Sequence, residues 1–185
     1  MALANYVPTC AKNTPGNERQ IFIAPTGTIT ALAETAGEIS TLTAVADAFK
    51  RIKADIDSVQ FTDDGTFSTS GAYTQSLIVR LSKPSTALNT LIDEIVSGIA
   101  CGFEIIHVDN NNNVWLSGQT IATKEGDSRP WNQVQVQTDS GTTLTDENLQ
   151  AVTLTFTRLS AYRPVPLDAT LKAAVLDGTA AYIDW

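Results

Sequence analysis

The chain has 185 residues, a net charge of -8 and a hydrophobic content of 43%, which is enough for one well-formed core and makes a single domain the expectation. Charged residues make up only 17%, below the usual quarter, and Thr, Ser, Asn and Ala take their place. The acidic balance argues against a general nucleic-acid binder, because affinity for the phosphate backbone needs Lys and Arg.

The sequence offers little for metal binding, membrane insertion or secretion. Cys10 and Cys101 are far apart, and with one histidine they cannot supply four Cys/His ligands to zinc. Two free thiols are favoured over a disulfide between them, which stays open. No run of about 18 apolar residues predicts a transmembrane helix, and the first residues lack the basic and apolar regions of a secretory signal.

The first third of the chain predicts an arm and several short strands. Residues 1–18 are irregular and punctuated by Pro and Gly. Short strands are predicted over residues 19–25 and 29–32. The stretch 41–58 has helix-tolerant alanines in its first half, but its second half alternates apolar with charged residues, which favours a strand.

A turn and a second clear strand follow. The segment Asp63-Asp64-Gly65 predicts a turn, and residues 73–81 predict a strand that pairs with the preceding one in a hairpin. Four apolar residues share one face of this strand: Tyr73, Leu77, Val79 and Leu81.

One amphipathic helix is predicted over residues 88–99. Its apolar residues form a single stripe at helical spacing: Leu88, Leu91, Ile92, Ile95, Val96 and Ile99. Pro84 and the hydroxyl residues after it mark the start, and Gly102 marks the end. We expect the helix to pack this stripe against a sheet.

The second half of the chain predicts a hairpin and two long strands. Residues 103–108 and 114–116 flank Asp109 and four asparagines, a residue type that tolerates left-handed backbone angles, so a β-hairpin is expected. Strict alternation predicts a strand over residues 132–138. Alternation of apolar residues with threonine predicts another over residues 152–157.

The last residues change character. Two prolines stop the preceding strand, and residues 168–176 have helix-forming content, with Leu171 and Val175 on one side. Tyr182, Ile183 and Trp185 suggest that the chain end docks on this subunit or on a neighbour.

No catalytic constellation can be assembled from the sequence. His107 is the one histidine; it lies in an apolar strand without a triad context and is interpreted as a structural residue on a sheet face. There is no nucleophile elbow, phosphate-binding loop or dinucleotide fingerprint. The pair Asp93-Glu94 is interpreted as the solvated face of the helix. An enzyme is the least favoured hypothesis, and no cofactor is expected.

Two segments carry oxygen ligands suited to calcium, Asp63-Asp64 and residues 109–113, but neither has the twelve-residue loop with its closing Glu, and both are interpreted as turns. The loose candidates for stacking single-stranded nucleic acid are Arg129, Trp131, Tyr162 and Arg163. The acidic balance argues against that role, and Trp131 is interpreted as a packing or interface anchor.

What remains is an assembly protein. Thr-rich strands present a neutral, hydrogen-bonding surface that neighbours can cover, and polar loops around residues 57–72 and 119–130 can reach adjacent subunits. Aromatic side chains are common anchors of interfaces. The candidate subunit-interface residues are Trp131, Tyr162, Tyr182 and Trp185.

A series of short motifs runs in order through residues 10–160. They are Cys10 with Pro15-Gly16, IFIA at 21–24, Gly37-Glu38-Ile39, Phe49-Lys50, residues 73–77, the apolar helix, the hairpin ending at Gly118, and residues 140–148 before VTLTF. In this order and spacing the chain resembles small virion proteins of Bacteroidetes phages that are placed as tail-tube-like structural proteins. One departure is the segment 146–149, DENL, where the family pattern has Asp-Arg-Asn-Gly.

The resemblance implies a β-rich α+β fold, a tail-tube-like β-sandwich or barrel with one amphipathic helix packed on the sheet. With residues 1–18 taken as an N-terminal arm from their composition, the resemblance implies a tail-tube-like domain over 19–160 and a C-terminal extension over 161–185, beyond the family's usual end. It also implies rings, typically hexameric, whose strands join into an inner β-barrel, and stacked rings that form the conduit for DNA ejection.

An acidic lumen would repel DNA and let it slide. The residues expected near the lumen or in a loop between rings are Asp55, Asp57, Asp63 and Asp64. The expected partners are copies of the chain itself, other tail or connector proteins, and DNA that passes without specific binding. The expected location is the virion tail, after assembly in the cytoplasm of the host bacterium, with no membrane association.

Two other hypotheses stay open. In the first, the chain is still a virion protein but occupies another position, as a head–tail connector, tail terminator or decoration protein. A glycan- or surface-binding module of β-sandwich type would use Trp115, Trp131 and Tyr162 as a sugar platform.

Overall fold

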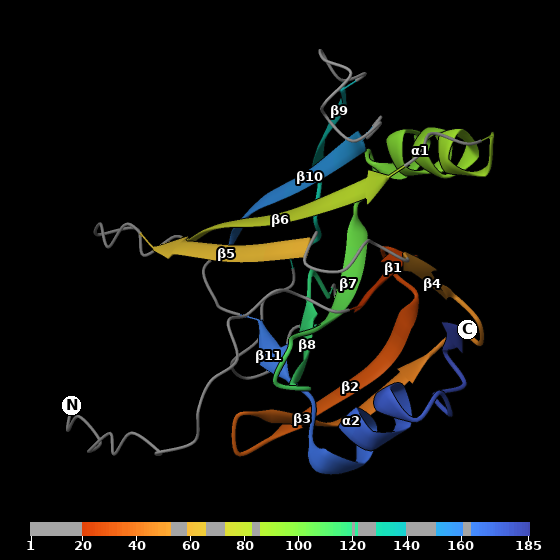
Figure 1. Cartoon of the computed structure of the whole chain (residues 1–185). Coiled ribbons are helices and arrows are strands. Elements are labelled where there is room, and N and C mark those ends of the chain that lie inside the picture. Colours follow the sequence, from red (N-terminus) through yellow and green to blue (C-terminus); the bar gives the residue numbers. More distant parts are fainter. Residues whose placement is uncertain are drawn as a thin grey trace.

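The computed structural model in Figure 1 describes residues 20–52, 59–65, 73–82, 86–119, 121, 129–139, 151–160 and 164–185. These residues form twelve strands and two helices, arranged in three sheets. The chain is therefore a β-rich α+β protein, which confirms the fold class expected from the alternating segments and the one long apolar stripe.

A six-stranded sheet, here called the central sheet, lies in the middle of the fold. Its strands are β1 (Gln20–Pro25), β4 (Phe49–Ile52), β7 (Phe103–Val108), β8 (Val114–Ser117), β11 (Val165–Pro166) and β12 (Ile183–Asp184). They lie in the order β11-β8-β7-β1-β4-β12. The β12 strand pairs parallel to β4, and the other pairs are antiparallel.

A four-stranded antiparallel sheet, here called the open sheet, crosses above the central sheet in Figure 1. Its strands are β5 (Val59–Gly65), β6 (Tyr73–Ser82), β9 (Gln133–Asp139) and β10 (Ala151–Ser160), in the order β5-β6-β10-β9. The turn expected at residues 63–65 is wrong: these residues continue β5 and pair with residues 73–75 of β6. Cross-strand pairing there outweighs the local preference of Asp-Asp-Gly for a turn.

The third sheet is a hairpin of β2 (Ile29–Thr35) and β3 (Glu38–Ala44). Ala36 and Gly37 have positive φ angles of 55° and 83°, as a two-residue type I′ turn requires. The sequence predicted a shorter β2. Of the helix-tolerant alanines, Ala44 ends β3, and Ala46 and Ala48 lie between β3 and β4 rather than in a helix. Of the strand expected within 41–58, β4 is formed, and residues 53–58 lie outside the described residues.

The expected amphipathic helix is α1 (Thr86–Gly98). Ile95 is 2% exposed, and Leu91, Ile92 and Ile99 pack partly buried against the core between the sheets, which confirms packing on a sheet. Val96 was expected to be buried as part of the apolar stripe but is 49% exposed, because the contact with the sheet is narrower than the apolar face of the helix. Within the described segments neither helix is long and apolar enough to cross a bilayer.

The residues after 163 are built into the central sheet. Helix α2 (Ala169–Leu176) begins after Asp168, whose carboxylate accepts a hydrogen bond from the backbone N–H of Leu171 at 2.8 Å. Both β11 and β12 belong to the central sheet, and Val175 and Ile183 are each 1% exposed. The part set apart from sequence as an extension therefore shares the core of the fold.

The central sheet is buried on both faces, so the described chain has two cores. Phe22 and Ile106 face the core under the β2–β3 hairpin and α2. Ile21 and Ile105 face the core under the open sheet and α1. This explains why all six residues of β7 are buried, a continuous run typical of a strand covered on both sides.

The β7–β8 hairpin confirms the most direct local prediction. The Asp109 carboxylate accepts hydrogen bonds at 2.8 Å from the backbone N–H groups of Asn111 and Asn113, and Asn112 has a φ of 60°. The asparagine run thus acts as a turn. Among the described residues no group of three or more acidic, His or Cys side chains is placed to hold a metal ion.

Candidate assembly surface

The open sheet ends in two long edge strands. In the described part of the chain, β5 pairs with β6 alone and β9 pairs with β10 alone, and each edge strand has seven residues. An edge strand presents a row of N–H and C=O groups that can pair with another chain. The central sheet differs, because its edge strands β11 and β12 have two residues each.

The two edge strands run in opposite directions. Each pair in the open sheet is antiparallel, so direction alternates across its four strands. A second copy related by rotation about an axis along the strands would therefore place its β5 antiparallel to β9 of the first copy. The pairing that the sheet already uses could continue across that boundary.

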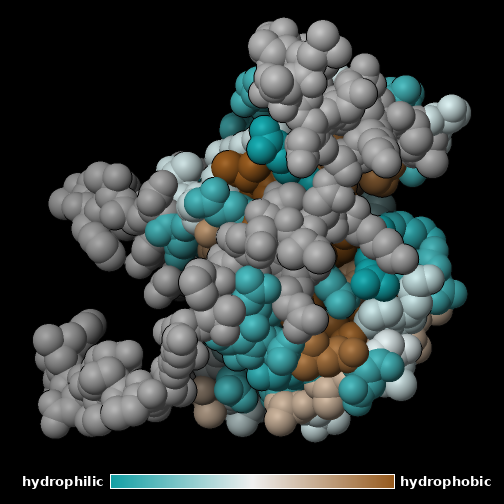
Figure 2. All heavy atoms as spheres, in the orientation of Figure 1, coloured by the Kyte–Doolittle hydropathy of each residue, from teal (hydrophilic) through white to brown (hydrophobic). Residues whose placement is uncertain are grey.

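The outer face of the open sheet is polar and almost uncharged. The pairing places two rows across all four strands: Gln60, Ile78, Thr155 and Gln135, then Thr62, Ser76, Thr157 and Gln133. Among the outward side chains that the structure describes, Arg80 carries the one charge. Figure 2 shows hydrophilic surface broken by separate hydrophobic patches, one of them over the open sheet.

The inner face is apolar and reaches one edge. Its rows are Val59, Val79, Leu154 and Val136, then Phe61, Leu77, Phe156 and Val134. Leu77, Val79, Leu154 and Phe156 are fully buried. Val136 on β9, at 36% exposed, shows that this face is incompletely covered at the β9 edge.

Beyond the apolar rows, the inner face carries a row of hydrogen-bonded polar side chains: Asp63, Gln75 and Arg158. Arg158 is 2% exposed, and its Nε donates to Gln75 Oε1 at 2.6 Å. Gln75 Nε2 donates to Asp63 Oδ1 at 3.3 Å, and Arg158 Nη1 donates to the Arg129 carbonyl at 2.8 Å. These bonds compensate the burial of the guanidinium.

Trp131 is part of the same buried region. The side chain is fully buried, its Nε1 donates to Ser117 Oγ at 3.0 Å, and the Arg158 guanidinium lies 5.1 Å from the ring centroid. Of the two interpretations from sequence, packing anchor and interface anchor, the structure places Trp131 as packing. It has no exposed surface in this chain for a neighbour to contact.

The aromatic chain end docks on this subunit. Tyr182 is 8% exposed with its ring 6.1 Å from Phe49, and burial raises the pKa of Tyr182 to about 12. Trp185 is 46% exposed and packs edge-on against Phe22 at 5.5 Å. Half of the Trp185 side chain therefore stays available to a partner. Tyr162 lies outside the described residues.

The predicted acidic residues do not form a cluster in the described part of the chain. Asp63 turns inward, where it accepts the bond from Gln75. Asp64 lies in β5 opposite Thr74. Asp55 and Asp57 lie outside the described residues.

His107 is a core residue, as predicted. It is 2% exposed and stacks on Phe61 with centroids 4.8 Å apart. Burial, partly offset by Asp109, lowers the pKa of His107 from 6.5 to about 3. The imidazole is therefore neutral at physiological pH and contributes packing rather than charge.

The residues that sequence reasoning missed are Gln75 and Arg158. The sequence pattern could have indicated both. Each stands at an inward position of an alternating strand, two residues from a fully buried apolar side chain. A long polar residue on an apolar face predicts a buried hydrogen-bond partner. The identity of that partner depends on strand pairing between distant segments.

Comparison of the chain with protein-family models, with curated proteins and with solved structures gave no match. The features that bear on function are therefore geometric. They are two long edge strands in opposite directions, a neutral outer face, and an apolar inner face that reaches the β9 edge. The glycan hypothesis loses one platform residue, since Trp131 offers no exposed ring face.

Proposed function

We propose that the chain is a non-enzymatic phage virion protein, a tail-tube subunit whose open sheets join edge to edge into rings. The observation that carries the proposal is the pair of long edge strands, β5 and β9, on a sheet of four alternating strands. Long edges are a hazard in a monomer, and natural proteins shorten or cover them. Among the residues that the structure describes, the edge strands of the central sheet are short and those of the open sheet are long.

Head-to-tail pairing of β9 with the next copy's β5 closes into a ring when the rotation fits. Because the sheet has an even number of strands, the closed barrel stays antiparallel throughout and has no edge. Six copies, the number implied by the resemblance, supply more strands than the roughly 16–18 that leave an aqueous channel in porins. The resulting lumen is wide enough in principle for a duplex.

The outer face of the open sheet would line that lumen, because the central sheet and α1 occupy the inner face. The two central rows of this face carry Gln, Thr, Ser and Ile but no charge. In these two rows passing DNA meets no cationic group to bind, and phosphate contacts with Lys and Arg supply most non-specific affinity. Arg80, which pairs with Thr153 in the next row, is the one described cation of the face. A contribution of Asp55, Asp57 and Asp64 to the lumen stays a prediction, whereas Asp63 faces inward.

Edge pairing also accounts for the exposed valine on β9. Val136 stands at one end of an inner row and Val59 stands at the other. Joining β9 to the next copy's β5 brings these two ends together, so each row continues around the ring. Val136, 36% exposed in the single chain, would then be covered.

The test compares two exposed valines. Val136→Lys places a charge at the β9 edge, and Val96→Lys places the same charge on α1, where the side chain is 49% exposed. We expect rings or tubes from the wild type and from Val96→Lys in negative-stain micrographs, and a folded monomer from Val136→Lys by light scattering. Assembly of Val136→Lys at the wild-type concentration would contradict the proposal.

A head–tail connector, tail terminator or decoration protein is the alternative within the virion. The open sheet serves a single ring as well as a stacked one, so ring formation does not separate these roles. Stacking does: rings that never stack at any concentration point to a connector or terminator. Tubes of many rings point to the tail conduit, assembled in the host cytoplasm with other tail proteins.

A further inference from the structure

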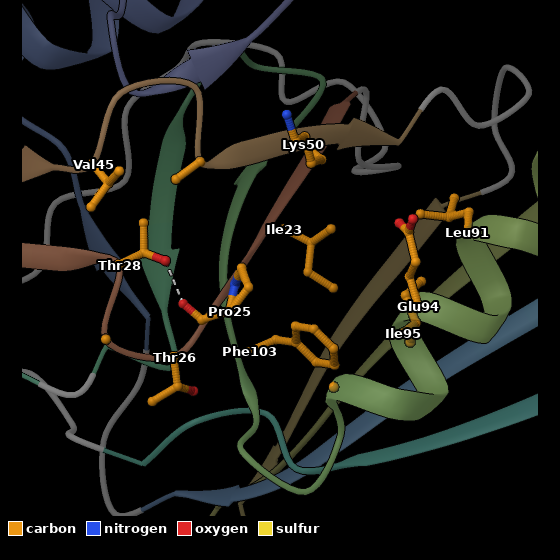
Figure 3. A pocket seen from close by; sticks show the side chains of 13 residues that line it. Ile23, Pro25, Thr26, Thr28, Val45, Lys50, Leu91, Glu94, Ile95 and Phe103 are labelled. Carbon is orange, nitrogen blue, oxygen red and sulfur yellow. Dashed lines mark hydrogen bonds between the residues drawn. The ribbon is translucent and has the colours of Figure 1, made fainter.

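An apolar groove of about 510 Å³ lies between α1, the turn from β1 to β2, and the segment that joins β3 to β4. Three of its lining side chains, Ile23, Ile95 and Phe103, are at most 5% exposed. Val45 forms part of its wall and is 56% exposed. Figure 3 shows Leu91 and Ile95 of α1 across the groove from Ile23 and Phe103.

The groove is preformed on the β2 side. The Glu104 carboxylate, fully buried, accepts hydrogen bonds from the backbone N–H groups of Gly27 at 3.3 Å and Ile29 at 3.2 Å. The Thr28 hydroxyl donates to the Pro25 carbonyl (Figure 3). These bonds hold the wall in place, and the volume lies within the roughly 300–1,000 Å³ of ordinary binding pockets.

We propose that this groove binds residues 2–8 of a second copy of the chain and so links one ring to the next. The segment reads ALANYVP and has no charged side chain; the first charge in the sequence is Lys12. Leu3, Tyr6 and Val7 match the apolar lining, and extended apolar segments bind by inserting such side chains into pockets. The proposal rests on the ring proposed above.

The length of chain before β1 allows a second copy to supply the segment. Gln20, where the arm joins β1, pairs with Val108 at one end of the strand, whereas the groove lies at the other end, where Pro25 pairs with Phe103. The two ends are separated by roughly 16 Å at about 3.3 Å per residue. Residues 9–19, which join the segment to β1, can span at most roughly 36 Å at about 3.3 Å per residue, which is enough to reach the groove of a neighbouring copy.

Two substitutions separate the arm from the groove. Leu3→Glu places a charge in the segment, and Val45→Glu places one on the exposed groove wall, where folding tolerates it. We expect each variant alone to form single rings that do not stack. An equal mixture should form stacks of two rings, because one variant still supplies the groove and the other the arm. Val96→Glu is the matched control and should stack like the wild type.

Normal stacking of either variant would overturn the proposal. Absence of two-ring stacks in the mixture would overturn the assignment to a second copy and indicate that each arm binds its own chain. If the wild type forms no rings at all, the tail-tube proposal fails, and the groove is judged by the following measurement.

A labelled peptide of residues 2–9 tests the contact without rings. It is titrated by fluorescence anisotropy against the full chain carrying Leu3→Glu, whose own segment competes poorly. We expect saturable binding that weakens at least tenfold when Val45→Glu is added and stays unchanged when Val96→Glu is added. Equal binding to both double variants, or no binding to any, would show that the groove does not take this segment.

Discussion

Replacing Trp131 by Phe distinguishes a core residue from an interface residue. Trp131 is fully buried and donates its indole N–H to Ser117 at 3.0 Å. Phe keeps an aromatic ring but loses that bond, which contributes about 1 kcal/mol. The smaller ring leaves a void beside Arg158 that costs about 1–2 kcal/mol. We expect the free energy of unfolding to fall by about 2–3 kcal/mol and Tm by about 5–10 °C.

The assay is urea unfolding followed by far-UV circular dichroism, at a concentration where the chain is monomeric. Trp185→Phe is the control, since Trp185 is 46% exposed and exposed substitutions usually change stability by less than about 0.5 kcal/mol. Folded Trp131→Phe should still assemble. Wild-type stability combined with a loss of assembly would refute the buried placement and restore Trp131 as an interface anchor.

Two further predictions concern pH and helix capping. The pKa of His107 is lowered to about 3 in the fold. Between pH 6.5 and 3 the unfolded chain therefore binds a proton that the folded chain does not. The free energy of unfolding should fall on acidification through this window by up to about 1.4 kcal/mol per pH unit. Its imidazole is the single one in the sequence, and its two C–H proton NMR signals should not shift between pH 7.5 and 4.5. A titration midpoint near 6.5 would contradict burial. Asp168→Ala removes the N-cap of α2 and should lower the free energy of unfolding by about 1 kcal/mol, measured by thermal unfolding. The control is Asp177→Ala, at the exposed C-terminal end of the helix, which should change Tm little. Equal effects of the two substitutions would show that the cap does not stabilise the fold.

The strands and the long helix were predictable because their signals are local. Alternation in β6, β9 and β10 and the stripe of α1 follow from periods of 2 and 3.6 residues. The asparagine turn follows from the backbone preference of that residue. The β2–β3 hairpin was harder, because Ala36 takes a positive φ of 55° that alanine rarely adopts.

The candidate surface was less predictable, because it depends on which strands are neighbours. Asp63-Asp64-Gly65 has the composition of a turn, yet pairing with β6 keeps it in β5. Trp131 and Arg158 lie 27 positions apart in sequence, and their contact arises where the open sheet packs on the central one. Edge strands can be recognised only once every other pairing is known.

The most direct measurement is a reconstruction by electron cryomicroscopy of the particles formed by the purified full chain. The account predicts a ring in which β9 of each copy pairs antiparallel with β5 of the next, with Gln135 and Thr155 facing the lumen. Rings in which β5 and β9 stay unpaired would contradict it. So would a chain that remains monomeric at every concentration and with every tail partner supplied.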